Sequence, residues 1–138
     1  MTVQSFFRFY WRGILVSLAI IYLSLAPPSD FKNIPMPVVE GMDKLVHFFM
    51  YLVLTVACML DIHFNKNSLS DKIKISYCIL FPILLGGILE ILQWKFTVSR
   101  SGDWFDMLAD TLGVVVGYFL MRLLMNGNKT SKQNNKDK

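Results

Sequence analysis

Acidic side chains interrupt the hydrophobic runs of this sequence, and they could supply proton-transfer or metal-binding chemistry. Ionisable groups at membrane depth are costly to bury, so they usually line a cavity or pair with each other. Histidine, arginine, tyrosine and amide side chains lie close to them along the chain. The candidate residues are Asp43, Lys44, His47, Tyr51, Glu90, Gln93, Arg100, Asp103, Asp106 and Asp110.

The spacing of these residues predicts helical faces, because residues three or four apart lie on the same side of a helix. The candidates form three such sets: Asp43, His47 and Tyr51; Glu90 and Gln93; and Asp106 and Asp110. In the third set the face continues to Gly113 and Gly117. Two small residues at this spacing would let another helix approach closely.

The composition predicts that a membrane surrounds these helices. The chain has 138 residues, of which 54% are hydrophobic and 17% are charged, and its mean hydropathy is +0.44. Apolar runs of this length can cross a hydrocarbon core of about 30 Å as helices. They cover residues 6–26, 45–62, 73–94 and 104–125. The sequence therefore predicts an all-α, polytopic membrane domain with four transmembrane helices over residues 1–125, and a disordered basic tail at 126–138.

Two of the runs have features that could change the number or the shape of the helices. The first run ends in a small-x-small tripeptide at residues 24–26, which resembles the cleavage site of a signal peptide. Pro27 follows at once and suits such a peptidase poorly, because the enzyme binds its substrate as a strand. We therefore expect a retained helix. In the third run, Pro82 and the pair Gly86 and Gly87 favour either a kink or local opening of the helix, or simple close packing.

The lysine and arginine positions predict the orientation of the helices. These residues are concentrated at the N-terminus, around the loop of residues 63–72 and in the tail, and are sparser around the loops 27–43 and 95–103. By the positive-inside rule, both termini should be cytoplasmic. The polar ends of the last three runs then meet on the outer side, and we expect one polar pocket that opens to the outside.

Charge balance limits the chemistry of this pocket. Its available cations are Lys44, His47 and Arg100, which are fewer than the acids around them. Shared protons, a bound divalent cation or a positively charged ligand could each resolve the excess. A buried ion-pair network that only locks the helices together is the structural alternative. Asp103 is expected at the rim as a solvated loop acid.

These residue types suggest separate roles within the pocket. Carboxylates and histidine can act as general acids and bases or as metal ligands, and arginine can anchor phosphate or carboxylate groups. The candidate catalytic residues, which are also the candidate ligands of a divalent metal, are Asp43, His47, Glu90 and Asp106. The candidate binding residues are Lys44, Tyr51, Gln93, Arg100 and Asp110. Catalysis and non-catalytic binding of a lipid or antibiotic both stay open at this point.

Other function classes find little support in the sequence. The basic residues flank hydrophobic runs and fill the tail, and no basic helix face with interleaved aromatic residues is present, which argues against nucleic-acid binding. Cys58 and Cys78 fall inside apolar runs, where we expect them to be small buried hydrophobic residues. A disulfide framework or a zinc site would need more cysteines or a closer spacing.

The order and spacing of the candidate residues resemble those of the motifs in the VanZ-like family of membrane proteins. The motifs that carry this resemblance are Asp43-Lys44-x-x-His47-Phe48-x-x-Tyr51, Glu90-x-x-Gln93, Arg100 and Asp106-x-x-Ala109-Asp110-x-x-Gly113-x-x-x-Gly117. The end of the first run, Ser24-Leu25-Ala26-Pro27, is similar as well. The resemblance covers about residues 15–122. Asp110 is a departure, because the family usually has asparagine at this position.

The resemblance implies a small, multi-helix protein of the bacterial cytoplasmic membrane. The founding member of the family is associated with teicoplanin resistance. The partners implied are therefore membrane lipid and a lipid-linked cell-wall precursor or a glycopeptide. The resemblance thus implies a role in the cell envelope or in antibiotic resistance, and it names no reaction.

Overall fold

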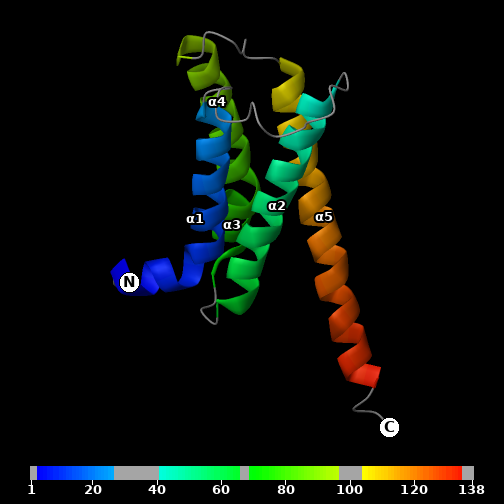
Figure 1. Cartoon of the computed structure of the whole chain (residues 1–138). Helices are drawn as coiled ribbons and strands as arrows, with labels where there is room; N and C mark the ends of the chain where they lie inside the picture. The colour runs from blue at the N-terminus through cyan, green and yellow to red at the C-terminus, as the bar shows by residue number, and fades with distance from the viewer. Residues whose placement is uncertain (1–2, 27–40, 66–68, 97–103, 135–138) are drawn as a thin grey trace.

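The structure, a computed structural model, describes residues 3–26, 41–65, 69–96 and 104–134. The described ranges are almost entirely helical and contain no strand. The helices are α1 (Val3–Leu25), α2 (Met42–Phe64), α3 (Asp71–Ile75), the π-helix η2 (Ser76–Leu80), α4 (Phe81–Phe96) and α5 (Trp104–Asn134). Figure 1 shows that they form one bundle with both termini at the same end. We call the opposite end of the bundle the distal end.

Segments long and apolar enough to cross a membrane occur four times within the described ranges. They are Phe7–Leu25, Met42–Phe64, Asp71–Lys95 and Trp104–Asn126. Large hydrophobic side chains are exposed along all of them, as expected for helices that face lipid instead of water. The predicted all-α, polytopic fold is therefore confirmed, and the chain is a multi-pass membrane protein. The side of the membrane on which the termini lie stays a prediction.

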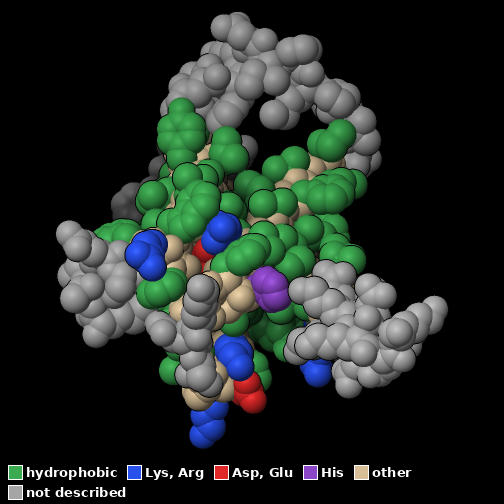
Figure 2. Space-filling view, turned by 90° about the horizontal axis from the view of Figure 1, so that it is seen from below, with side chains coloured by type: hydrophobic (Ala, Val, Ile, Leu, Met, Phe, Trp, Pro, Cys, Tyr) green, Lys and Arg blue, Asp and Glu red, His purple; other side chains and the backbone are tan. Residues whose placement is uncertain are grey.

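Basic side chains are distributed unevenly between the two ends of the bundle. Figure 2, seen from the end that carries the termini, shows several Lys and Arg side chains around that face. The described basic residues in the turns nearest to this end are Arg8, Arg12, Lys72, Lys74 and Arg122. Lys44 and Lys95 lie in the turns nearest to the distal end. This asymmetry is the pattern on which the predicted cytoplasmic termini rest.

Two glycines on α5 set its packing against α2, which is the most extensive helix interface. A Cβ atom added to Gly113 would collide with the carbonyl oxygen of Phe48, and one added to Gly117 would lie 3.0 Å from the carbonyl oxygen of Leu52. The glycine stripe therefore packs directly on the α2 backbone, as the sequence predicts. Because His47 lies beside this contact, the close approach also positions its side chain against α5.

The third membrane span is one continuous helix whose hydrogen-bond pattern widens just before Pro82. In η2, the Phe81 N–H donates to the carbonyl of Ser76, five residues earlier. Proline has no N–H to donate and crowds the carbonyl four residues before it. A π-helical turn removes this conflict within an otherwise α-helical segment. The local opening predicted for this region thus precedes Pro82, and does not lie at the glycine pair that follows.

The first and last helices differ from the sequence-based expectations, α1 in its shape and α5 in its length. α1 is bent at Tyr10, which has non-helical angles (φ −114°, ψ 15°), so its first turns leave the bundle at an angle in Figure 1. α5 continues to Asn134, through most of the segment 126–138 for which the sequence predicts disorder. Each residue added to a helix gains one hydrogen bond, and no proline interrupts this segment. The membrane span itself ends near Asn126.

Candidate functional site

His47, Glu90 and Asp110 come together from three helices in the distal half of the bundle. The Nδ1 atom of His47 lies 3.0 Å from Oδ1 of Asp110 and 3.9 Å from Oε1 of Glu90. The side chains of these residues, which we call the triad, are 8%, 10% and 3% exposed in the order His47, Glu90, Asp110. The imidazole is within hydrogen-bond distance of the Asp110 carboxylate, with which it can exchange a proton, and the ligand atoms of all three residues can bind a metal.

Gly86 of α4 makes room for the triad on the side of Asp110. A Cβ atom at Gly86 would lie 2.8 Å from Oδ2 of Asp110 and 3.3 Å from the hydroxyl oxygen of Tyr51. The carboxylate and the phenol therefore border the same point on the α4 backbone. Tyr51 is only 1% exposed, and its hydroxyl has no hydrogen-bond partner within the described part of the chain. A buried hydroxyl without a partner is costly, so it is suited to a bound ligand or water.

A second ion pair lies one turn closer to the distal end of α5. Lys44 Nζ is 3.6 Å from Oδ1 of Asp106, and it also lies 5.9 Å from the ring centre of Phe105. The Asp106 side chain is 7% exposed, whereas that of Lys44 is 42% exposed. This pair links the first turns of α2 and α5 at the rim of the site. The ligand atoms that lie within 4.8 Å of one another come from His47, Glu90 and Asp110, and Asp106 is not in this group.

Two further predicted residues have positions that differ from the expected pocket. Gln93 is buried, and its amide nitrogen donates a 2.9 Å hydrogen bond to the carbonyl of Ser24, which ties α4 to the end of α1. Asp43 is exposed in the first turn of α2, although it is spaced for the same face as His47. An acid is favourable there because it meets the positive end of the helix dipole. Arg100 and Asp103 lie outside the described residues.

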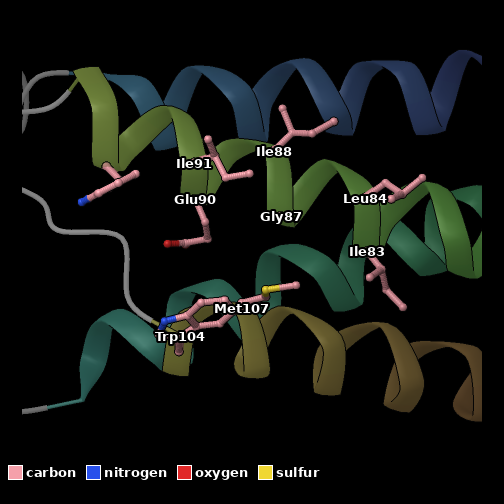
Figure 3. A pocket seen from close by; sticks show the side chains of 9 residues that line it. Ile83, Leu84, Gly87, Ile88, Glu90, Ile91, Trp104 and Met107 are labelled. Atoms are coloured by element: carbon pink, nitrogen blue, oxygen red, sulfur yellow. The ribbon is translucent and has the colours of Figure 1, made fainter.

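An apolar groove of about 570 Å³ runs between α4 and α5 and reaches the triad. Glu90 is part of its wall, and Figure 3 shows the carboxylate pointing from α4 into the space between the two helices, toward Trp104. The other wall residues are mostly large and apolar, including Ile83, Leu84, Ile88, Ile91, Trp104 and Met107. A volume of this size falls in the range of about 300–1,000 Å³ that is typical of ligand sites.

Comparison with known proteins shows the family of the chain. The sequence profile of the VanZ/LLP1 family matches residues 3–125, which include all four membrane spans almost completely. The chain belongs to the VanZ/LLP1 family. No curated protein and no solved structure matches the chain. The resemblance seen in the sequence motifs is therefore confirmed, and the triad and groove described above lie within the region that the VanZ/LLP1 profile covers.

This VanZ/LLP1 protein has a second buried polar cluster, which the sequence analysis missed, at the end that carries the termini. Asp61 of α2 is 1% exposed. Its Oδ2 atom accepts hydrogen bonds from the Gly13 N–H (2.9 Å) and the Tyr77 hydroxyl (3.0 Å), and its Oδ1 atom lies 3.4 Å from a guanidinium nitrogen of Arg12. Because α1 bends at Tyr10, Asp61 caps the straight part of α1 as an N-cap residue would.

The signal for this cluster was present in the sequence. Asp61 is an acid inside an apolar run, and it falls on the same helical face as His47, fourteen residues earlier. Arg12 entered the sequence analysis only as one of the basic residues near the N-terminus. Cys58 and Cys78 lie near this cluster as buried, free thiols, which agrees with the prediction that they form no disulfide.

Proposed function

We propose that this VanZ/LLP1 protein binds an amphipathic, lipid-type molecule, with its apolar tail in the groove between α4 and α5 and its polar head at the triad. The observation that carries this proposal is that the Glu90 side chain borders both the apolar groove and the triad. Its side chain lines the apolar groove, and its Oε1 atom lies 3.9 Å from His47 Nδ1. An apolar space and an ionisable centre thus meet at one residue, which is the chemistry of an amphipathic ligand.

The surroundings of the groove also favour a ligand that enters from the membrane. Ile88 and Ile91 on its α4 side are each 55% exposed, and Trp104 at its distal end is 82% exposed. Exposed apolar side chains face acyl chains in a membrane protein, so a lipid tail could enter sideways without crossing water. Tryptophan favours the membrane interface, which supports a position near headgroup depth for the distal end of the groove.

The orientation and the ligand class are parts of this proposal. With cytoplasmic termini, the triad lies toward the outer leaflet of a bacterial cytoplasmic membrane. Lipid-linked cell-wall precursors, one of the ligand classes that the family resemblance implies, combine a tail with a polar head. His47 could transfer a proton between either carboxylate and such a head group. The proposal itself concerns binding, and it holds with or without a subsequent reaction.

Native mass spectrometry of the full chain, released from detergent micelles without any chelator, tests this function. We expect the wild-type protein to retain one amphiphile per chain. Gly87 lines the groove, and a Cβ atom there would meet only Met107 Cε at 3.7 Å. A leucine at this position should therefore fill the groove, and Gly87→Leu should lower retention at least about tenfold, which corresponds to about 1.4 kcal/mol.

A matched control adds apolar volume on a lipid-facing surface away from the groove. Val116 of α5 is 43% exposed, so Val116→Leu should retain the amphiphile as the wild type does. Glu90→Gln should also lower retention, because it changes the head-group end without filling the groove. Equal retention in the wild type, Gly87→Leu and Glu90→Gln would show that the lipid adheres to the general apolar surface, and the proposal would be rejected.

A further inference from the structure

We infer that the triad of His47, Glu90 and Asp110 is a binding site for a divalent first-row metal ion such as Zn²⁺ or Mn²⁺. One ligand atom from each residue can be chosen so that all three atoms lie within 4.8 Å of one another. In a tetrahedral site with bonds of about 2.1 Å, neighbouring ligand atoms are about 3.4 Å apart. The distances of 3.0 and 3.9 Å from His47 Nδ1 bracket this value. Small side-chain rotations would therefore suffice for coordination.

The ligand types fit a borderline or hard divalent ion. Zinc is bound in proteins by histidine nitrogen and by carboxylate oxygen, and manganese suits carboxylate ligands, so one imidazole with two carboxylates can hold either ion. The charges agree with this choice. Two carboxylates face one imidazole, and a divalent ion beside neutral His47 would balance both of them.

A separate observation points to a ligand at the same place. The Tyr51 hydroxyl is almost completely buried, has no hydrogen-bond partner among the described residues and borders the same point on Gly86 as Asp110. A metal-bound water or ligand atom beside Asp110 would give this hydroxyl a partner. Catalytic metal sites commonly combine three protein ligands with an open position for water or substrate. Three ligands and one orphaned hydroxyl fit this pattern.

A metal bound at the triad would determine which head groups the site can bind. This inference about the ligand rests on the proposed function. Two buried carboxylates repel an anionic head group, whereas a divalent ion held by them attracts one. Phosphate oxygens are good ligands for such an ion. The substrate class that follows is therefore an anionic, phosphate-bearing amphiphile, whose tail occupies the groove and whose phosphate completes the coordination of the metal.

Equilibrium dialysis of the full chain against Zn²⁺ in detergent micelles tests the metal site. The protein should first be stripped with EDTA, and any histidine tag should be removed. We expect one Zn²⁺ ion per chain. Glu90→Gln, Asp110→Asn and His47→Gln should each weaken binding by more than about 100-fold, since even a lost outer-shell partner costs 10–100-fold.

Two controls separate this site from other zinc ligands. Asp71 is an exposed acid at the opposite end of the bundle, and Cys58 and Cys78 are free thiols. Asp71→Asn and the double variant Cys58→Ser/Cys78→Ser should bind Zn²⁺ as the wild type does. The inference is overturned if folded wild-type protein binds no Zn²⁺, if the triad variants still bind it, or if only the cysteine variant loses it. An amphiphile retained by wild-type protein that binds no Zn²⁺ would overturn the metal site and leave the proposed function standing, so the two proposals can fail separately.

Discussion

Replacement of Asp61 with alanine is expected to lower the free energy of unfolding by about 3–5 kcal/mol. Asp61 accepts hydrogen bonds from the Gly13 N–H and the Tyr77 hydroxyl, and it forms an ion pair with Arg12. Its side chain is fully buried. Removal of the carboxylate leaves the buried Gly13 N–H without its acceptor, and such a group keeps its full desolvation cost.

The position of Asp61 makes this loss larger than that of an ordinary surface contact. The carboxylate joins three membrane spans, because Arg12 and Gly13 belong to α1, Asp61 to α2 and Tyr77 to η2. A Cβ atom at Gly13 would collide with the Tyr77 hydroxyl, so the glycine permits this close packing. The cluster therefore fixes α1 against both other spans at the end that carries the termini.

Equilibrium unfolding in mixed micelles with increasing denaturing detergent measures this effect. Asp71→Ala is the control, because Asp71 is an acid at the same end whose side chain is 90% exposed and whose pairing with Lys74 lies on the surface. This control should show no measurable loss of stability. Asp61→Asn should fall between the wild type and Asp61→Ala, since the amide oxygen can still accept one hydrogen bond. An Asp61→Ala protein as stable as the control would contradict this account of the cluster.

Gly113→Val is expected to separate α2 from α5, at a cost of about 3 kcal/mol. The Cβ atom at this position would meet the carbonyl oxygen of Phe48 and, at 3.1 Å, the backbone nitrogen of Leu52. Backbone atoms cannot rotate away as side chains can, so the helices themselves must move apart. Because His47 precedes Phe48 and Asp110 precedes Gly113 by one turn, the same movement should open the triad.

The same unfolding assay and the Zn²⁺ dialysis together test this prediction. Gly87→Ala is the matched control, because its Cβ atom would meet only a flexible methionine end at 3.7 Å. It should leave stability unchanged or raise it slightly, by up to about 1 kcal/mol, through the better helix propensity of alanine. A Gly113→Val protein that keeps wild-type stability would show that α2 and α5 are not in close backbone contact.

The sequence predicted the fold well because each helix carries its own signal. Apolar runs of membrane-spanning length gave the four spans, and the small residues Gly113 and Gly117 identified a close helix contact without showing its partner. Pro82 indicated a local opening, and the structure places it at residues 76–80, before the proline. The bend at Tyr10 had no comparable signal, because no proline or glycine pair marks it.

The candidate site was predicted less completely, for a physical reason. Spacing shows which residues share a face of one helix, and the rotation of that helix against its neighbours decides which of them meet. Asp43 and His47 were predicted on one face, yet the structure buries His47 and leaves Asp43 exposed. Asp110 was predicted as a binding residue, and it is the residue that contacts His47 most closely. Asp61, which the sequence analysis did not include, lies near the end of α2 opposite to Asp43 and His47.

The central claim is that the groove and the triad form one site for an amphipathic ligand. A high-resolution cryo-EM map of the protein in a lipid nanodisc, bound to a rigid antibody fragment, tests it most directly. The account predicts elongated density in the groove between α4 and α5, continuous at Glu90 with density among His47, Glu90 and Asp110. A groove closed by protein side chains, with His47 turned away from Asp110, would contradict it.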